Sequence, residues 1–281
     1  MKLEDLGYNE NFKKFRIEQN LEDFEVGRVI TEHKERYIIK TEKGEYEAEI
    51  TGNMRYSAKD RSDYPAIGDW VAITKYELDF AIIHKIFPRE SIIERQAVGQ
   101  FGEKQIIATN IDYALITQAV DRDFNINRIE RYLTICYSAK VNPIIILSKI
   151  DLVNETELEL LMIELKSRIK NIQIISVSNQ TNNGYEKIKE ILLKGKTYCL
   201  LGSSGVGKST LINNLAGQEI LRTSSISTST NKGRHTTNHR ELNILENGSI
   251  LIDNPGMKEV GIVDTTNGLE ITFNKLIQIS K

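Results

Sequence analysis

The sequence predicts an α/β domain with a mainly parallel sheet, preceded by a small all-β domain. Between residues 24 and 97, short stretches of alternating apolar and polar residues are separated by turn signals, and no long helix is indicated. After residue 98, strands alternate with helices, which is typical of a parallel sheet. Residues 143–148 are apolar almost throughout, as the central strands of such sheets are.

These patterns divide the chain into four segments. Residues 1–23 are a charged extension in which Phe12, Phe15 and Ile17 have the spacing of a short amphipathic helix. The all-β domain, a small barrel or sandwich, occupies 24–97, and the α/β domain occupies 98–265. Residues 266–281 begin a C-terminal segment. In the α/β domain we expect strands at 112–120, 143–148, 172–177, 197–201 and 249–253, and helices at 127–140, 155–170, 185–193 and 208–216.

Composition narrows the class of protein. With 281 residues the chain is long enough for two modest domains, and a net charge of −2 gives no support for nucleic-acid binding by bulk charge. Cys136 and Cys199 lie in apolar stretches and cannot build a disulfide framework or a zinc cluster. The charged N-terminus lacks the apolar core of a signal peptide, and no apolar run approaches the roughly 18 residues that span a bilayer. We expect a cytoplasmic protein that contacts no membrane.

A phosphate-binding loop of the pattern GxxxxGK[ST] lies between a predicted strand and a predicted helix. Its glycines let backbone N–H groups wrap closely around phosphates. Lys208, the expected catalytic lysine, would reach the β- and γ-phosphates, and Ser209 would offer its hydroxyl to Mg²⁺. An accidental glycine-rich turn is the alternative, which the flanking strand and helix disfavour. The residues expected to bind phosphate are Gly202, Ser203, Ser204, Gly205, Val206, Gly207, Lys208, Ser209 and Thr210.

Two further parts of such a site follow the loop. The last predicted strand ends in DNPG (253–256), which by itself is a common turn sequence. After a phosphate-binding loop, however, Asp253 can hold Mg²⁺ through a water, and the N–H of Gly256 can bind the γ-phosphate. A Ser/Thr-rich loop between the two motifs ends in Thr236 and Thr237. One of these threonines is the expected second Mg²⁺ ligand, and Thr236 is slightly favoured.

A base-recognition motif precedes the loop. SKID (148–151) resembles the tetrapeptide [N/T]KxD, whose Asp accepts from guanine N1–H and the 2-amino group. Adenine lacks that donor pair, so an unpaired carboxylate disfavours it. Lys149 would stack its stem along the base, although the tetrapeptide alone could begin a helix with Asp151 as its cap. The segment 176–178 resembles a Ser-Ala motif whose backbone contacts guanine O6. The residues expected at the base are Ser148, Lys149, Ile150, Asp151, Ser176, Val177 and Ser178.

The order of these motifs is unusual. A typical GTPase runs from the phosphate loop through the switch motifs to base recognition, whereas here base recognition comes first and DNPG comes last. Every motif still lies at a strand end, so one sheet can gather them. The sequence therefore predicts a circularly permuted P-loop GTPase domain that binds GTP or GDP with Mg²⁺.

With this order, the chain resembles the RsgA (YjeQ) family of ribosome small subunit-dependent GTPases over nearly its whole length. The resemblance rests on GDWV (68–71), FPRES (87–91), QIIATNIDYALI (105–116), the phosphate loop, GRHTT and DNPGM. It implies an N-terminal OB-fold barrel, a permuted GTPase domain, and GTP hydrolysis coupled to late maturation of the small ribosomal subunit. The implied partners are that subunit and its rRNA, with no DNA partner and a monomeric chain.

The sequence departs from the family in one respect. The family continues into a zinc-binding segment with three Cys and one His, whereas this sequence ends at Lys281, where that segment would begin. Neither Cys136 nor Cys199 can replace those ligands, so zinc is not carried over to this sequence. A truncated form and a shortened family member are the two explanations.

The hydrolytic mechanism has a gap at residue 257. Met257 stands where Ras-like GTPases have a water-orienting Gln, so intrinsic hydrolysis should be slow. We hypothesise that His235 orients the attacking water; a solvated or RNA-contacting His235 is the equal alternative. A nucleotide-gated RNA- or ribosome-binding module and, less favoured, a P-loop small-molecule kinase are the competing functions. The basic residues considered for RNA contact are Lys13, Lys14, Arg16, Arg122, Arg128 and Arg131.

Overall fold

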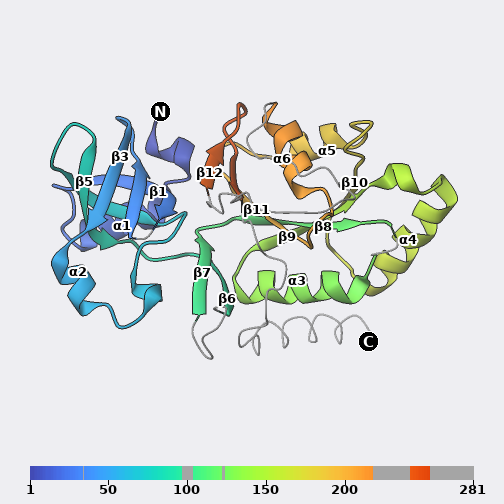
Figure 1. Ribbon diagram of the computed structural model, residues 1–281, viewed down its shortest axis with the longest axis horizontal. Helices are drawn as coiled ribbons and strands as arrows, with labels where there is room; N and C mark the ends of the chain where they lie inside the picture. The colour runs from blue at the N-terminus through green and yellow to red at the C-terminus, as the bar shows by residue number, and fades with distance from the viewer. Residues whose placement is uncertain (34, 97–103, 122–123, 218–240, 254–281) are drawn as a thin grey trace, which may run out of the picture.

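The structure is a computed structural model that describes residues 1–33, 35–96, 104–121, 124–217 and 241–253. A β-barrel lies beside an α/β domain (Figure 1). The barrel strands pair in the order β1-β2-β3-β5-β4, and β4 pairs back with β1 to close the ring. Their bounds are β1 Glu25–His33, β2 Arg36–Lys40, β3 Glu45–Ile50, β4 Trp70–Lys75 and β5 Phe80–Ile86.

This strand order confirms the OB-fold prediction. All barrel pairings are antiparallel except β3 with β5, which run parallel. Between β3 and β4 lie the short helix α2 (Gly52–Ser57) and the 3₁₀ turn η2 (Arg61–Asp63). Alternate side chains such as Tyr37, Ile39 and Ile83 fill the barrel interior.

The N-terminal extension packs against the barrel. It contains a 3₁₀ turn (η1, Leu3–Leu6) and the helix α1 (Glu10–Glu18), whose N-cap Asn9 accepts hydrogen bonds from the first turn. Phe12 is buried and stacks with other aromatic rings against Trp70 of β4, whereas Ile17 is exposed. The predicted short helix is confirmed, with its apolar face formed by the two phenylalanines.

The α/β sheet has the strand order β10-β9-β8-β11-β13-β12. All its pairings are parallel except that of β12 with β13 at the edge. The strand that leads into the phosphate loop, β11, is central. Strands earlier in the chain lie on one side of it and strands later in the chain on the other, so the permuted topology is confirmed. The bounds are β8 Tyr113–Ala119, β9 Asn142–Ser148, β10 Ile174–Ser176, β11 Thr197–Leu201, β12 Glu241–Ile244 and β13 Ile250–Asp253.

Helices cover both faces of this sheet (Figure 1). Alternation along β8 sends Ala114 and Ile116 into a core with α3 (Ile126–Ser138) and α4 (Glu155–Arg168). Leu115 points to the opposite core with α5 (Tyr185–Ile191) and α6 (Lys208–Ala216). Within the described ranges, no helix is both long and apolar enough to cross a bilayer.

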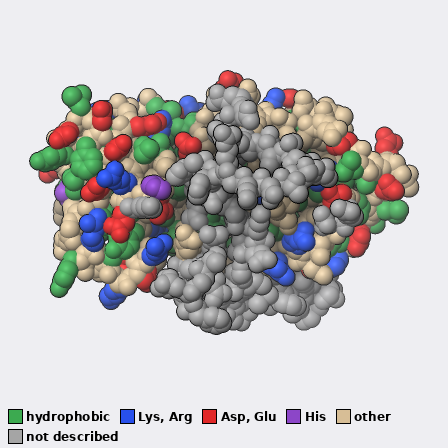
Figure 2. Space-filling view, viewed as in Figure 1, with side chains coloured by type: hydrophobic (Ala, Val, Ile, Leu, Met, Phe, Trp, Pro, Cys, Tyr) green, Lys and Arg blue, Asp and Glu red, His purple; other side chains and the backbone are tan. Residues whose placement is uncertain are grey.

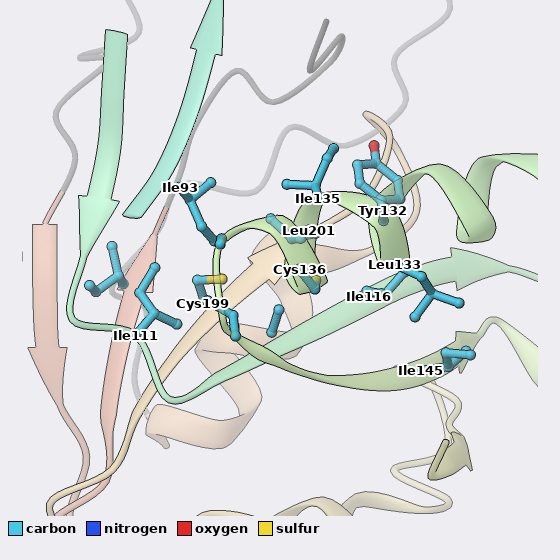
Figure 3. Packing of buried hydrophobic residues seen from close by; sticks show 14 of the residues in the cluster. Ile93, Ile111, Ile116, Tyr132, Leu133, Ile135, Cys136, Ile145, Cys199 and Leu201 are labelled. Carbon is cyan, nitrogen blue, oxygen red and sulfur yellow. The ribbon is translucent and has the colours of Figure 1, made fainter. Parts of the chain in front are cut away.

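Two features of the sheets were not predicted. β6 (Ile92–Gln96) and β7 (Lys104–Thr109) form a separate antiparallel hairpin, and its residues Ile93 and Ile107 belong to the same core as α3. Figure 3 shows Ile93 in this core. The predicted domain boundary at residue 97 falls between these two strands. The edge strand β12 also contacts β1 of the barrel through the pair Thr31 and Glu241, which joins the two sheets.

Both cysteines are buried in the core shown in Figure 3. Burial raises the pKa of both thiols above the ordinary value, that of Cys199 to about 12. Because the thiolate is the reactive form, neither Cys136 nor Cys199 should react with Ellman's reagent at pH 8 while the protein is folded. Both should react after denaturation in urea. Rapid labelling of the native protein would show that this core opens readily.

Candidate nucleotide-binding site

The phosphate loop connects β11 to α6 at the carboxyl edge of the parallel strands. Gly202 has a φ of +149°, and a Cβ atom there would lie 2.3 Å from the carbonyl oxygen of Thr117 on β8. Gly207 has a φ of +93°, and a Cβ there would lie 2.6 Å from Nδ2 of Asn179. Both positions therefore need glycine for close packing as well as for backbone conformation.

Lys208 is the first residue of α6 and folds back over this loop. Its Nζ donates to the carbonyl oxygens of Gly202 at 2.7 Å and Ser203 at 2.6 Å. The ammonium is thus held at the centre of the predicted phosphate cradle. Burial of Tyr132 on α3 raises the pKa of its phenol, and Ser203 of the loop acts in the opposite direction. Ser209 follows Lys208 in the first turn of α6 and is half-buried.

The base-recognition residues lie in the loops after β9 and β10. Asp151 is exposed in a 3₁₀ turn (Ile150–Leu152), and Ser178 Oγ donates to its Oδ1 at 2.5 Å. Lys149 has a left-handed backbone conformation, with a φ of 61°. Its Nζ forms an ion pair at 2.9 Å with Asp121, which follows the end of β8. The carboxylate of Asp151 is therefore fixed at one oxygen by the neighbouring loop and is exposed to solvent.

The base loops and the phosphate loop are directly bonded. Ser148, which is buried, donates from Oγ to the carbonyl oxygen of Val206 at 2.7 Å. A hydroxyl in place of the usual Asn amide thus still reaches the phosphate loop. The bond places Asp151 and Lys208 on the same edge of the sheet, as the permuted order requires.

The second base segment, 176–178, begins in the sheet and ends in the loop after β10. Ser176 points to the opposite side, where its Oγ lies 4.0 Å from Sδ of Met162. The N–H of Val177 donates to the carbonyl of Leu147 at 2.7 Å, so it is used within the sheet. Ser178, which is among the predicted residues, bonds to Asp151, and Asn179 follows it in the same loop.

Asn179 was missed by the sequence reasoning. Its Nδ2 donates to the carbonyl oxygen of Gly207 at 3.0 Å, and its Oδ1 accepts from the hydroxyl of Tyr185 at 2.8 Å. The only sequence signal was its position directly after a serine in the loop that follows a predicted strand.

Several predicted site residues lie outside the described ranges: His235, Thr236, Thr237, Gly256 and Met257. Asp253 is the last residue of β13, which runs parallel to β11 and ends beside the start of the phosphate loop. Its backbone is therefore at the site, and its side chain is outside the described set.

The described side chains suit Mg²⁺ that is bound together with a phosphate better than a metal site built from protein ligands alone. Across the described ranges, no three His, Cys, Asp or Glu residues are grouped to hold a metal. Magnesium bound with a nucleotide, however, takes only one or two protein oxygens beside phosphate and water. The hydroxyl of Ser209, next to Lys208, is an oxygen of the type that such a complex uses.

The basic residues considered for RNA contact have different environments. Arg16 donates to the carbonyls of Leu21, Glu22 and Phe24 and so closes the loop after α1. Lys13 pairs with Glu10 at 2.8 Å, and Lys14 with Glu18 at 3.7 Å. Arg131 is exposed on α3, and Arg122 lies outside the described residues.

Comparisons with known proteins agree with this geometry. The profile of the RsgA GTPase family matches residues 86–263. The small ribosomal subunit biogenesis GTPase RsgA 2 of Lactiplantibacillus plantarum is 42% identical over 84% of this chain and 66% of its own length. RsgA 1 of Listeria innocua is 38% identical over 100% of this chain and 78% of its own length. The chain thus spans about two thirds of the first relative and more of the second.

Two solved structures have a similar fold. YjeQ from Thermotoga maritima superposes with a TM-score of 0.64 at 22% identity, covering 85% of this chain and 77% of its own. YloQ, described as a circularly permuted GTPase, superposes with a TM-score of 0.62 at 18% identity, covering 90% and 78%. The strand order around the central β11 agrees with a permuted topology. The chain therefore belongs to the RsgA family of circularly permuted GTPases.

Proposed function

We propose that this GTPase hydrolyses GTP to GDP and phosphate slowly by itself, is stimulated by the small ribosomal subunit, and assists late maturation of that subunit. The observation that carries the nucleotide assignment is the bond from Ser148 to Val206, because it joins the base-recognition loop to the phosphate cradle. The ribosomal role is supported by relatives named small ribosomal subunit biogenesis GTPases.

Each described residue has a defined task in this proposal. Lys208 would leave its two loop carbonyls for the β- and γ-phosphates and neutralise the charge that develops during transfer. Ser209, Thr236 and Asp253 would hold Mg²⁺, which supplies further charge neutralisation when bound. The N–H of Gly256 would bind the γ-phosphate.

Selection of guanine would come from Asp151. One of its oxygens already accepts from Ser178, and the carboxylate can accept from guanine N1–H and the 2-amino group. Adenine has no matching donors, so the carboxylate would be desolvated without a partner. The stem of Lys149, steadied by Asp121, would pack along the base.

The water-orienting group is proposed to be His235, because Met257 has no hydrogen-bonding group suited to that task. Ordering of its loop on the ribosome would then account for stimulation of turnover. A His235 that only contacts RNA is the alternative within the same proposal.

Ribosome contact is proposed for the barrel. A depression of about 670 Å³ beside α2 is lined by Lys59 and Lys85, by Asp63, and by Met54 and Ile86. Such a mixture of cations and apolar groups suits an RNA backbone with unstacked bases. On the ungreyed barrel face in Figure 2, however, acidic and basic side chains are interspersed, so shape and local contacts would matter more than a broad positive field. The proposal includes a monomeric cytoplasmic protein.

GTP turnover with and without purified small ribosomal subunits tests the function. We expect slow release of phosphate alone, stimulation by subunits, and competition by GDP but not ADP. Lys208→Ala should lower stimulated turnover at least about 100-fold, because it removes a preorganised charge from the transition state. His235→Ala should abolish stimulation while leaving GDP binding unchanged.

The same assay separates the competing functions. Subunit binding that depends on the nucleotide but persists in Lys208→Ala without turnover would favour a binding module. Equal competition by ATP would favour a small-molecule kinase and would contradict the role given to Asp151.

A further inference from the structure

We propose that Asn179 is a positioning residue that bonds the base-recognition loop to the phosphate loop, so that guanine selectivity depends on its side chain. This inference rests on the proposed nucleotide site and goes beyond it. No motif in the sequence pointed to Asn179, and the role follows from its contacts alone.

A directed series of hydrogen bonds runs through Asn179. Asn214 on α6 donates from Nδ2 to the hydroxyl of Tyr185 at 3.0 Å. Tyr185 donates to Oδ1 of Asn179 at 2.8 Å, and Nδ2 of Asn179 donates to the carbonyl oxygen of Gly207 at 3.0 Å. We call these three bonds the Asn179 bridge. Because Gly207 is the N-cap of α6, the bridge begins and ends on the same helix.

The bridge and Ser148 hold consecutive carbonyls of the phosphate loop. Ser148 bonds Val206 from the loop after β9, and Asn179 bonds Gly207 from the loop after β10. The residue before Asn179 is Ser178, which holds Asp151 at 2.5 Å. A shift of Asn179 would therefore move the carboxylate that reads the base relative to Lys208.

The chemistry of the bridge requires an amide side chain. Tyr185 is buried, and burial raises the pKa of its phenol to about 12, so the hydroxyl remains a donor at neutral pH. Asn179 must then accept at one atom and donate at the other, which an amide does and a carboxylate does not. The bridge also requires glycine at position 207, because a Cβ atom there would lie 2.6 Å from the amide nitrogen of Asn179.

Three substitutions separate the contributions. Asn179→Ala removes both bonds of Asn179, whereas Asn179→Asp keeps the acceptor for Tyr185 but removes the donor to Gly207. Tyr185→Phe removes only the outer bonds. Asn183→Ala is the matched control, because Asn183 is an exposed asparagine of the same loop.

The test is equilibrium and stopped-flow binding of fluorescent GDP, with unlabelled GDP, IDP and ADP as competitors. For Asn179→Ala we expect GDP to dissociate about tenfold faster, in line with the loss of one to two hydrogen bonds. The preference for GDP over IDP, which lacks the 2-amino group, should fall in parallel. Asn179→Asp should behave like Asn179→Ala, Tyr185→Phe should show a smaller effect, and Asn183→Ala should match the wild type.

The change in base preference is the decisive readout, because mere loosening of the fold would weaken GDP and IDP equally. Melting temperatures identify any variant that is simply unstable. If Asn179→Ala and Asn179→Asp keep both the affinity and the GDP/IDP ratio of the wild type, the positioning role is wrong. If the wild type itself does not prefer GDP to ADP, the proposed guanine site is wrong instead.

Discussion

Replacing Asp69 by Ala should lower the free energy of unfolding by about 4 kcal/mol, because it leaves a buried guanidinium without its carboxylate. Asp69 directly precedes β4 in the sequence, and its side chain is fully buried. Arg89, which is itself largely buried, donates to both of its oxygens, with distances of 2.9 and 2.7 Å. A paired, hydrogen-bonded arrangement of this kind is costly to break from one side.

Other bonds of Asp69 add to this effect. Its carboxylate also accepts from Thr109 Oγ1 at 2.7 Å and from the N–H of Ala66 at 2.8 Å. Thr109 ends β7, whose hairpin packs into the α/β core, so Asp69 joins the barrel to the next structural unit. In the Ala variant the N–H of Ala66 would lose its acceptor, and the hydroxyl of Thr109 would keep only the carbonyl of Ile67 at 3.3 Å.

Urea denaturation followed by circular dichroism measures the change. Asp79→Ala, which alters an exposed aspartate between β4 and β5, is the control and should remain within about 0.5 kcal/mol of the wild type. The double variant Asp69→Leu with Arg89→Met removes both charges. It should lower the free energy of unfolding less than Asp69→Ala alone. A loss below about 1 kcal/mol for Asp69→Ala would show that water replaces the pair.

The same residues show what sequence motifs did and did not reveal. GDWV and FPRES served as markers of a family, and their structural roles became visible only in three dimensions. Gly68 is required because a Cβ would lie 2.2 Å from the carbonyl oxygen of Thr109, and Asp69 and Arg89 form the buried pair. These contacts join positions that lie 20 or more residues apart, and alternation of apolar residues does not encode them.

Regular elements were predictable where their pattern was strong. The apolar strand at 143–148 and the phosphate loop with its helix were placed correctly, since periodicity and glycine spacing are local signals. The strand β12 was missed because its four residues are stabilised by pairing with β13 and β1 rather than by their own pattern.

At the site, the predicted base segment 176–178 included Ser178 but stopped one residue short of Asn179. The strand β10 has only three residues, so Ser178 lies beyond its end, where the alternation of side chains along a strand no longer applies. Ser176 therefore faces α4, while Ser178 reaches Asp151. Asn179 could not be found from the sequence, because its two partners come from α5 and from the start of α6.

Replacing Arg28 by Met should also lower the free energy of unfolding by about 4 kcal/mol, because four hydrogen bonds donated by a fully buried guanidinium are lost together. Arg28 donates to the carbonyls of Leu6, Gly68 and Asn110 and to Oγ1 of Thr197. These acceptors belong respectively to the N-terminal extension, the barrel, the segment before β8, and β11.

The charge of Arg28 is retained despite its burial. Desolvation lowers its pKa to about 10, while Asp112 and Asp69 act in the opposite direction, so the guanidinium is protonated at neutral pH. Its Cζ also lies 5.6 Å from the ring centroid of Trp70, within the range of a cation–π contact. Carbonyl dipoles and an aromatic face thus replace the direct carboxylate partner that buried cations usually have.

Because Thr197 begins the strand that leads into the phosphate loop, loss of Arg28 should also uncouple the barrel from the nucleotide domain. We expect the wild type to unfold in one transition in urea and Arg28→Met to unfold at lower concentration, with tryptophan fluorescence changing before far-ultraviolet circular dichroism. Trp70, the single tryptophan, lies in the barrel and packs against the N-terminal extension, so its fluorescence reports on these two parts rather than on the nucleotide domain. The exposed Arg36→Met is the control. Coincident transitions with an unchanged midpoint in Arg28→Met would show that the barrel and the phosphate-loop strand are held together by their apolar contacts without this arginine.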